Sequence, residues 1–390
     1  MATGVKIVVA TMELRTYRAI RCIRKRKRKF LGITITLEVA IIMKIREDIK
    51  LDFDDVLIVP RRTTVASRKE VSLYREFKFF HSPKQWVGIP IIAANMYSTG
   101  SIKMAYSLSS LGCSVALHKH HENVGIKPLF KDMVDSVWFS TGMSDEDFNK
   151  TREMVKELRL SDVSPNICID IANGYTDSFV KYCAKIRDLS PNSIILAGNV
   201  CSPEMTQELI VYGGVDICKI GLGSGSACLT RIQTGVGYPQ LSAVLECSKV
   251  AHGLKSGDGR IGLICSDGGC KVSGDVCKAF GAGSDFVMLG GMLAGTDESN
   301  NGDNQDGYST FYGMSSQQAQ ETHGNGVPTY AVAEGKTVRI KNKGSAKEVI
   351  NGILGGLRSS CTYTGVNSLK DYAKSVEFIN VRNTHNKVFE

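Results

Sequence analysis

The chain has 390 residues, of which 43% are apolar and 22% are charged, values that are ordinary for a globular protein with one large α/β barrel or two domains. The net charge of +9 would suggest a nucleic acid or membrane partner, but residues 1–42 hold ten basic and two acidic residues and so carry +8 of it. The remaining residues carry only +1, which gives no support for either partner.

Residues 1–42 are predicted to be a basic, poorly ordered N-terminal extension. The basic run Arg24–Lys29 and the apolar residues 31–43 superficially resemble a signal sequence. However, Glu38 interrupts the apolar run, thirteen residues are too few to span a bilayer, and no small-residue cleavage site follows. We therefore expect no membrane anchor. Nuclear targeting or nucleic-acid binding by the basic run remains an alternative.

The chain contains twelve cysteines, and most of them lie inside apolar runs, as Cys113, Cys168, Cys218 and Cys265 do. No Cys-x-x-Cys pair occurs. This usage favours buried free thiols in a reducing, cytoplasmic setting. We expect inert core thiols everywhere except at Cys228.

Eight short apolar segments, each closing on glycine or a polar residue, alternate with helix-like stretches. They lie at 89–95, 114–120, 136–142, 167–174, 193–200, 216–223, 262–269 and 285–291. This alternation predicts a TIM (β/α)8 barrel as the catalytic domain, residues 43–390. A doubly wound sheet uses the same alternation, but polar residues gather at the C-terminal end of nearly every segment, which favours the barrel.

Amphipathic stretches between the strands predict helices at 145–158, 176–186 and 202–212. Ser202 is a good cap for the third of these helices, and Pro203 suits its first turn. A last helix is expected from residue 353. After the eighth strand, residues 296–308 form a polar loop too long for a simple connection. In a barrel, an insertion at about 296–340 would cover the active-site mouth as a mobile flap.

The run from Asp216 to Thr230 is an apolar strand that breaks into a glycine-rich loop with one cysteine, Cys228. Such a loop turns tightly and points backbone groups at a ligand. The positive charges of Lys219 and Arg231 would favour a thiolate at Cys228, which predicts a nucleophile. The alternative is that Cys228 is another small buried residue.

Three segments predict a phosphate site at the barrel mouth. Ser266–Gly269 follows the seventh strand, Leu289–Gly291 follows the eighth, and Gly313–Ser316 lies in the insertion. The loops after strands seven and eight of a barrel commonly bind phosphate through backbone N–H groups. Asp267 is unsuited to phosphate, but it could accept hydrogen bonds from two ribose hydroxyls.

The segments 221–231 and 234–244, which include the run Thr234-Gly-Val-Gly-Tyr-Pro-Gln-Leu-Ser242, resemble the guanosine monophosphate (GMP) reductase family. This family is the sister of inosine monophosphate (IMP) dehydrogenase. The resemblance extends from about Met43 to the C-terminus. It implies NADPH-dependent reductive deamination of GMP to IMP, with release of ammonia, in purine salvage. It also implies that Cys228 forms a covalent thioimidate and that Thr230 and Glu334 protonate the departing nitrogen.

The resemblance assigns further residues to ligands. For GMP they are Asp267, Gly268, Gly269, Gly290, Gly291, Gly313, Met314, Ser315, Glu334 and Gly335. For NADPH they are Ser67, Arg68, Lys119, Asp170, Ile171, Ala172, Leu222, Gly223, Met314, Tyr330, Ser359, Ser360, Cys361 and Thr362. For a potassium ion they are Gly223, Gly225, Cys228 and Arg231. A homotetramer is implied because a neighbouring subunit completes the cofactor site in the family.

Several positions depart from the family pattern. Tyr97 stands in place of an aspartate, Ala331 of an arginine, Ser224 of a proline and Leu229 of a threonine. Losing the arginine removes a bidentate donor, so we expect reduced ligand affinity with the mechanism intact. The segment His118–His121 could suggest zinc, but neighbouring strand residues point to opposite faces, and no cysteine or carboxylate partner is evident.

Three other functions are compatible with parts of the sequence. An IMP dehydrogenase shares the barrel and the cysteine, but most members insert a regulatory domain between early strands, and residues 114–136 leave no room for one. A flavin-dependent barrel oxidoreductase would use the same phosphate loops. A nucleotide-binding protein could have lost turnover through the changes at Tyr97 and Ala331.

Overall fold

The computed structural model describes residues 17–30, 33–257, 259–300, 306–323 and 326–385. The chain divides into two compact units, residues 1–50 and 51–390. In the first unit, β1 (Tyr17–Phe30) and β2 (Ile33–Arg46) pair antiparallel. The domain boundary at residue 42 and the poor order of the extension stay predictions. No helix in the described ranges has the length and apolar character needed to cross a bilayer.

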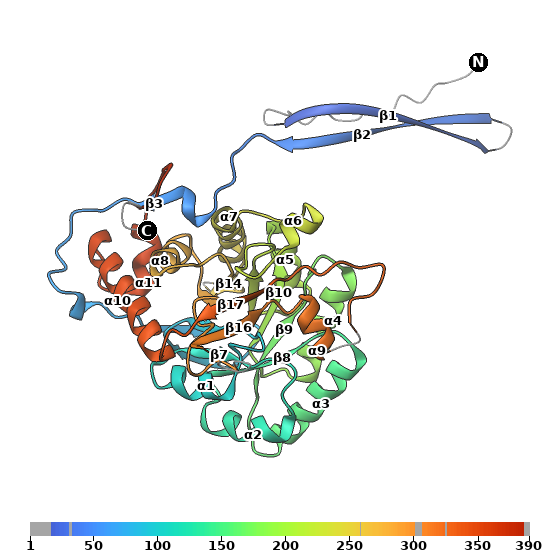
Figure 1. The fold of residues 1–390 in the computed structure, drawn as a ribbon. Coiled ribbons are helices and arrows are strands. Elements are labelled where there is room, and N and C mark those ends of the chain that lie inside the picture. The colour runs from blue at the N-terminus through green and yellow to red at the C-terminus, as the bar shows by residue number, and fades with distance from the viewer. Residues whose placement is uncertain (1–16, 31–32, 258, 301–305, 324–325, 386–390) are drawn as a thin grey trace. The chain divides into compact units, whose positions relative to one another are not determined.

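Eight parallel strands of the second unit close into a barrel in the order β10-β11-β14-β15-β6-β7-β8-β9, with helices packed around it (Figure 1). The strands are β6 (Ile91–Ala93), β7 (Ser114–Ala116), β8 (Val137–Thr141), β9 (Asn166–Asp170), β10 (Ile195–Val200), β11 (Ile217–Ile220), β14 (Leu263–Asp267) and β15 (Phe286–Leu289). Each of the eight predicted segments contains, or nearly contains, one of these strands. The prediction of a (β/α)8 barrel is confirmed.

Residues of each barrel strand alternate between two cores. In β6, Ile91 and Ala93 face the helices, whereas Ile92 packs inside the barrel with Leu196 and Cys265. This alternation follows from the period of two along a strand, and both faces are apolar because helices cover the outside. Each barrel strand is therefore a mainly apolar run in the sequence, and polar residues follow at its C-terminal end.

Helices follow the strands in the order expected for the barrel. They are α1 (Ile102–Ser109), α2 (Asn123–Asp132), α3 (Asp145–Arg159), α4 (Asp177–Leu189), α5 (Pro203–Val211), α6 (Thr230–Thr234), α7 (Gln240–Gly253), α8 (Ser273–Gly281), α10 (Ala346–Thr364) and α11 (Leu369–Ser375). The predicted start of α5 is confirmed, because the Ser202 hydroxyl accepts the Met205 amide and Pro203 begins the helix. The expected last helix begins earlier than predicted, since Ser345 caps α10, and α11 follows it.

A hairpin covers the N-terminal end of the barrel. It consists of β4 (Arg75–Lys78) and β5 (Gln85–Gly88). Phe77 and Trp86 from the hairpin join the inner core, with ring centroids 4.8 and 4.9 Å from that of Phe286 at the start of β15. The Trp86 indole N–H donates to the Asp135 carbonyl at 2.7 Å. The hairpin thus seals the end of the barrel away from the pocket.

The insertion after the eighth strand contains its own small sheet, which we call the flap. β16 (Tyr308–Tyr312) pairs antiparallel with β17 (Thr337–Lys341), and α9 (Gln317–His323) lies between them in the chain. The remaining short elements are η1 (Phe53–Asp55), β3 (Val56–Ile58), η2 (Arg68–Glu70), β12 (Lys255–Ser256), β13 (Gly259–Arg260) and β18 (Phe378–Asn380).

Candidate active site

A pocket of about 640 Å³ opens at the C-terminal ends of the barrel strands. Its lining comes from the ends of β6 to β11, β14 and β15, from the glycine-rich loop and from the flap. Flap residues such as Phe311, Gln320 and His323 close one side of it. The insertion thus lies at the mouth of the barrel, and the volume suits a ligand of nucleotide size, whereas the mobility of the flap stays a prediction.

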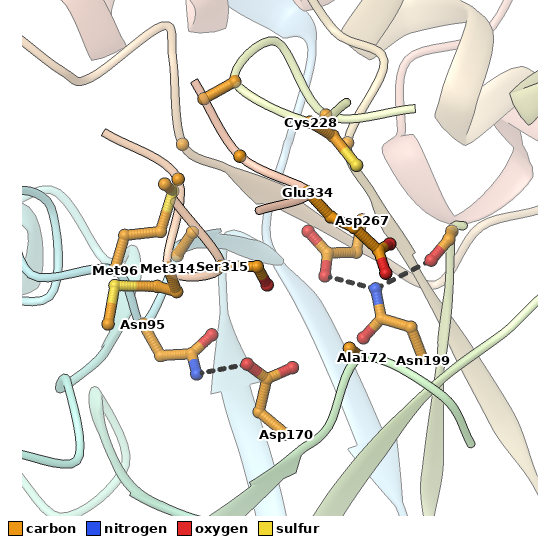
Figure 2. A pocket seen from close by; sticks show the side chains of 18 of the residues that line it. Asn95, Met96, Asp170, Ala172, Asn199, Cys228, Asp267, Met314, Ser315 and Glu334 are labelled. Atoms are coloured by element: carbon orange, nitrogen blue, oxygen red, sulfur yellow. Dashed lines mark hydrogen bonds between the residues drawn. The ribbon is translucent and has the colours of Figure 1, made fainter. Parts of the chain in front are cut away.

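A chain of two hydrogen bonds joins Cys228 to the flap. The Cys228 thiol donates to Thr230 Oγ1 at 3.1 Å, and the Thr230 hydroxyl donates to Glu334 Oε2 at 2.6 Å. Cys228 is only partly buried and lines the pocket, as Figure 2 shows. A thiol, a hydroxyl and a carboxylate in this order form a path along which a proton can move.

Backbone contacts hold this path together. The Leu229 amide donates to the Glu334 carbonyl at 2.6 Å, and the Lys336 amide donates to the Ala227 carbonyl at 2.9 Å. A Cβ built on Gly313 would lie 2.9 Å from the Ala227 carbonyl oxygen, so only glycine lets the flap approach this closely. The cysteine loop and the flap residues around Glu334 are therefore one packed unit.

A buried lysine bridges two carboxylates at the floor of the pocket. Lys219 is 1% exposed, and its ammonium donates to Asp170 and, at 3.1 Å, to Asp267. The amides of Asn95 and Asn199 each donate at 2.9 Å to Asp170 Oδ2 and Asp267 Oδ2, respectively (Figure 2). The carboxylates are thereby fixed in orientation.

The charges of this network support one another. Burial alone would lower the pKa of Lys219, but the carboxylates of Asp170 and Asp267 outweigh burial and raise it well above its usual value. Burial favours the neutral form of Asp170, yet its contacts with Lys219 and Asn95 hold its pKa below the usual value. Lys219 and Asp170 are therefore charged at neutral pH.

The charged groups around Cys228 are not arranged as the sequence predicted. Lys219 pairs with two carboxylates on the floor of the pocket, and Arg231 donates to Asp52 at 2.8 and 3.3 Å and to the Tyr238 carbonyl. Within the described residues, the side-chain partner of the Cys228 thiol is Thr230. The two cations predicted to face the thiol therefore pair with carboxylates, and the Thr230 hydroxyl contacts the thiol instead.

All ten residues assigned to GMP lie in the pocket wall. They are Asp267, Gly268, Gly269, Gly290, Gly291, Gly313, Met314, Ser315, Glu334 and Gly335. The three glycine-rich segments predicted for phosphate thus meet in one cavity. A Cβ on Gly291 would lie 2.3 Å from Ser226 Oγ, which shows how closely the eighth strand approaches the cysteine loop. Roles for individual residues stay predictions.

The residues assigned to the cofactor fall into two groups. One group lines the pocket and consists of Lys119, Asp170, Ile171, Ala172, Leu222, Gly223 and Met314. The other group lies outside it and consists of Ser67, Arg68, Tyr330, Ser359, Ser360, Cys361 and Thr362. Within that second group, Ser67 caps η2 and Arg68 begins it, and η2 packs against α10, the helix that carries Ser359–Thr362. Tyr330 is 91% exposed, and the Cys361 side chain is fully buried.

Of the residues assigned to potassium, Gly223, Gly225 and Cys228 share one loop, and Arg231 lies beside it in α6. The Cys228 amide donates to the Gly225 carbonyl at 3.0 Å, and Gly223 and Gly225 line the pocket. A Cβ on Gly223 would meet Arg231 Cγ at 2.6 Å, so Arg231 packs against the turn. No group of three or more histidine, cysteine or acidic side chains able to hold a metal occurs in the part of the chain that the structure describes, the histidines of 118–121 included.

Sequence reasoning missed Asn95, Asn199 and the inward position of Lys219. A signal for Lys219 was present, because Ile217 packs inside the barrel and a residue two positions on shares its face. Asn95 lies just beyond β6 and Asn199 lies near the C-terminal end of β10, where barrel enzymes place functional side chains. His120 and His323 also line the pocket, and only the fold brings them together.

Comparisons with known proteins agree with this geometry. The IMP dehydrogenase / GMP reductase domain matches residues 50–388. Proteins named GMP reductase from Escherichia coli O81 (strain ED1a), Shigella boydii serotype 4 (strain Sb227) and Escherichia coli (strain K12 / DH10B) are each 49% identical over 354 residues, which cover 89% of this chain and 99% of the relative. The chain therefore belongs to the IMP dehydrogenase / GMP reductase family.

Proposed function

We propose that this protein is an NADPH-dependent oxidoreductase that converts GMP to IMP and releases ammonia. The observation that carries the proposal is the hydrogen-bonded path from Cys228 through Thr230 to Glu334 in the wall of a nucleotide-sized pocket. The relatives named GMP reductase support the same reaction, because nearly their whole length is matched.

In this proposal the pocket holds GMP by both ends. Backbone N–H groups of the glycine-rich segments around Gly268, Gly290 and Gly313 bind the phosphate. Asp267 accepts the ribose hydroxyls, since Lys219 and Asn199 engage its Oδ2 and, within the described residues, no hydrogen bond occupies its Oδ1. The purine then lies toward Cys228 at the rim.

The reaction balances with the groups present. The Cys228 sulfur adds to C2 of the purine, and the C2 amino group leaves as ammonia, which gives a covalent thioimidate. When bound, NADPH supplies the hydride that C2 requires. The carbon–sulfur bond then breaks, IMP leaves, and the sulfur is a thiolate again. Two protons are taken up, so the products are IMP, NADP⁺ and an ammonium ion.

Thr230 and Glu334 handle the protons of this scheme. Glu334 accepts the thiol proton through the Thr230 hydroxyl, which leaves the sulfur anionic for attack. The same path returns a proton to the departing nitrogen. A carboxylate 2.6 Å from the hydroxyl is within the range of a general acid–base.

The residues present fit the cofactor and the cation. Lys119 is a partly exposed cation on the pocket wall, which suits the extra phosphate of NADPH. Asp52 neutralises Arg231 beside the turn of Gly223 and Gly225, so the carbonyl oxygens there can hold a potassium ion without a facing uncompensated charge. The cofactor group on η2 and α10 would serve the site of a neighbouring subunit in a homotetramer.

The test is to follow NADPH absorbance with GMP and to assay ammonia. We expect oxidation of NADPH that depends on GMP and that Cys228→Ala abolishes, while GMP binding to the variant persists. The reverse preference, oxidation of IMP with NAD⁺ and no reduction of GMP, would identify an IMP dehydrogenase. Binding of GMP without NADPH oxidation by the wild type would identify a protein that has lost turnover.

A further inference from the structure

Five aromatic side chains meet where the flap crosses the barrel mouth, and we call them the aromatic clasp: Tyr97, His118, His120, Tyr312 and His323. The Tyr97 ring centroid lies 5.1 Å from that of His118, 5.0 Å from that of His323 and 6.0 Å from that of Tyr312. The rings of His120 and His323 stack at 4.1 Å with an interplanar angle of 14°. Aromatic pairs at these separations attract one another.

The clasp joins two parts of the fold. Tyr97 follows β6, and His118 and His120 follow β7, so three rings belong to the barrel. Tyr312 ends β16 and His323 ends α9, so two rings belong to the flap. The Tyr312 hydroxyl also lies 3.4 Å from His323 Nε2. The contacts therefore seat the flap on barrel residues other than those of the Cys228 loop.

The clasp also reaches the pocket residues between β16 and α9. The Tyr97 backbone amide donates to Met314 Sδ at 3.4 Å, and the Tyr97 carbonyl accepts a hydrogen bond from the Asn300 side-chain amide at 3.1 Å. Met314, Ser315, His120 and His323 all line the pocket. Because Met314 and Ser315 lie in the chain between Tyr312 and His323, a displacement of these two clasp residues would move the segment that carries Met314 and Ser315.

The histidines of the clasp are neutral at physiological pH. Burial, aided by neighbouring histidines and by Lys150, lowers the pKa of His118 to about 3. Burial, with His323, Lys119 and Lys150 adding to it and Asp147 opposing it, lowers the pKa of His120 to about 4. Burial lowers the pKa of His323 as well. Two stacked protonated rings would repel each other, so the seated flap favours the neutral forms.

His121 completes the charge surroundings. Its ring stacks on that of His118 at 3.7 Å, and its Nε2 lies 3.1 Å from the Gly100 carbonyl. Burial lowers its pKa too. The Lys150 ammonium donates to the carbonyls of His121 and, at 2.7 Å, of Lys119. The groups around the clasp are therefore mostly cationic or neutral, which opposes protonation of its histidines.

We propose that Tyr97 and His323 are positioning residues that hold Met314 and Ser315 of the flap over the pocket. The assignment of Met314 and Ser315 to ligands rests on the proposed function, but the seating of the flap does not. An aspartate, the residue that the family pattern carries at this position, has no ring to place against His118, Tyr312 and His323. The tyrosine at position 97 thus helps to hold the flap against the barrel, and does not only lower the affinity for ligands.

Hydrogen exchange of the ligand-free protein tests the seating directly. Tyr97→Phe keeps the ring, and we expect wild-type exchange in peptides covering residues 313–323. Tyr97→Asp and the flap variant His323→Ala should each speed that exchange by about tenfold or more, with no change in β11. Because His323 is on the flap, this second variant answers the question even if Tyr97→Asp fails to fold. Wild-type protection in His323→Ala would overturn the proposal.

The pH dependence of flap hydrogen exchange is a second test of the seating. The histidines have pKa values below the ordinary 6.5 when the flap is seated, so seating is favoured above that pH and weakens as pH falls from 6.5 toward 4. We expect faster flap exchange at about pH 5 than at about pH 7.5, after correction for intrinsic exchange. His323→Phe keeps a ring that cannot titrate and should reduce this difference.

Kinetics separate the positioning role from simple stability. In Tyr97→Asp we expect the KM for NADPH or GMP to rise about tenfold while kcat changes less than about threefold, and Tyr97→Phe should behave as the wild type. Faster flap exchange with unchanged Michaelis constants would overturn the positioning role. If the wild type does not oxidise NADPH with GMP, the proposed function fails, and the exchange data alone decide the seating.

Discussion

At the scale of single residues, Glu334 has the most demanding position in the site. Its carboxylate accepts a hydrogen bond from the Thr230 hydroxyl at 2.6 Å, and the Thr230 oxygen in turn accepts a hydrogen bond from the Cys228 thiol. Glu334→Gln keeps the shape but removes the negative charge that draws the proton. We expect kcat to fall about 10²- to 10⁴-fold with little change in GMP affinity, measured by NADPH oxidation and by calorimetry.

A matched control for this prediction is Glu321→Gln. Glu321 lies on the exposed side of α9 and contacts Gln317. The control should turn over as the wild type does. Equal losses in the two variants, or unchanged turnover in Glu334→Gln, would contradict the assignment of Glu334 to proton transfer.

Lys219 should be the costliest single charge to remove. Lys219→Met leaves Asp170 and Asp267 without their shared cation, and breaking a buried ion pair costs about 3–5 kcal/mol of unfolding free energy. Asp170 is held ionised mainly against its burial by Lys219, so the variant should regain stability as pH falls and that carboxylate becomes protonated. Denaturant unfolding at several pH values measures both effects.

Lys278 offers a comparison for Lys219 within the same chain. It is also buried, at 6% exposure, but it faces one carboxylate, Asp275 at 3.5 Å, and the Phe53 carbonyl. Lys278→Met should therefore lose less unfolding free energy than Lys219→Met. The opposite ranking would show that the two carboxylates at the pocket floor do not depend on Lys219.

At the scale of elements, the hairpin of β4 and β5 closes one end of the barrel through Trp86. Trp86 is 1% exposed, packs on Phe286 and donates to the Asp135 carbonyl. Trp86→Ala removes the ring and leaves a cavity, so we expect a loss of about 3–5 kcal/mol in unfolding free energy. Trp86→Phe keeps most of the packing and should lose less.

The same variants test whether the two ends of the barrel are independent. The pocket lies at the C-terminal ends of the strands, and Trp86 lies at the other. We therefore expect both Trp86 variants to bind GMP normally at temperatures where they are folded. A large change in GMP affinity without unfolding would argue against this separation.

The barrel strands were predictable because each one is a local signal. A buried strand is a short apolar run, and its end is marked by glycine or a polar residue, as at Asp170 and Asp267. The start of α10 was predicted too late, since Ser345 and Ala346 look like the end of a loop until the cap is seen. The pairing of β16 with β17 and the aromatic clasp depend on contacts between distant residues, which periodicity does not encode.

The site was predictable in part for the same reason. Local composition alone indicates Cys228, Asp267 and the glycine-rich segments as candidate site residues, and all of them line the pocket. Lys219 was placed beside Cys228 because the two are close in sequence. In the fold, strand alternation directs Lys219 into the barrel, and its partners come from two other strands, β9 and β14.

At the scale of the whole molecule, the cofactor group on η2 and α10 lies outside the pocket of its own chain. If it serves a neighbouring subunit, inactive variants should complement each other. Cys228→Ala lacks the nucleophile, and Arg68→Ala should raise the KM for NADPH. Mixed oligomers formed by unfolding and refolding both variants together should recover activity at low NADPH, because some sites then hold both intact residues.

Each variant refolded alone is the control for this experiment. Activity of the mixture no greater than the sum of the separate variants would show that Arg68 acts within its own chain or not at all. Recovery should also fall on dilution, as the subunits separate. The measurement thus reports both the oligomer and the assignment of Arg68.

The proposed proton path is divided between two parts of the fold, and this division affects how easily the Cys228 thiol is oxidised or alkylated as well as how fast it reacts. Cys228 and Thr230 lie in the glycine-rich loop and helix that follow β11, whereas Glu334 lies in the flap segment before β17. If that segment lifted, the carboxylate that takes the thiol proton in the proposed mechanism would be withdrawn, and the thiol would be a poorer target for oxidants and electrophiles. In the proposed mechanism, Cys228 would therefore react only while the segment that carries Glu334 lies against its loop, as it does in this structure.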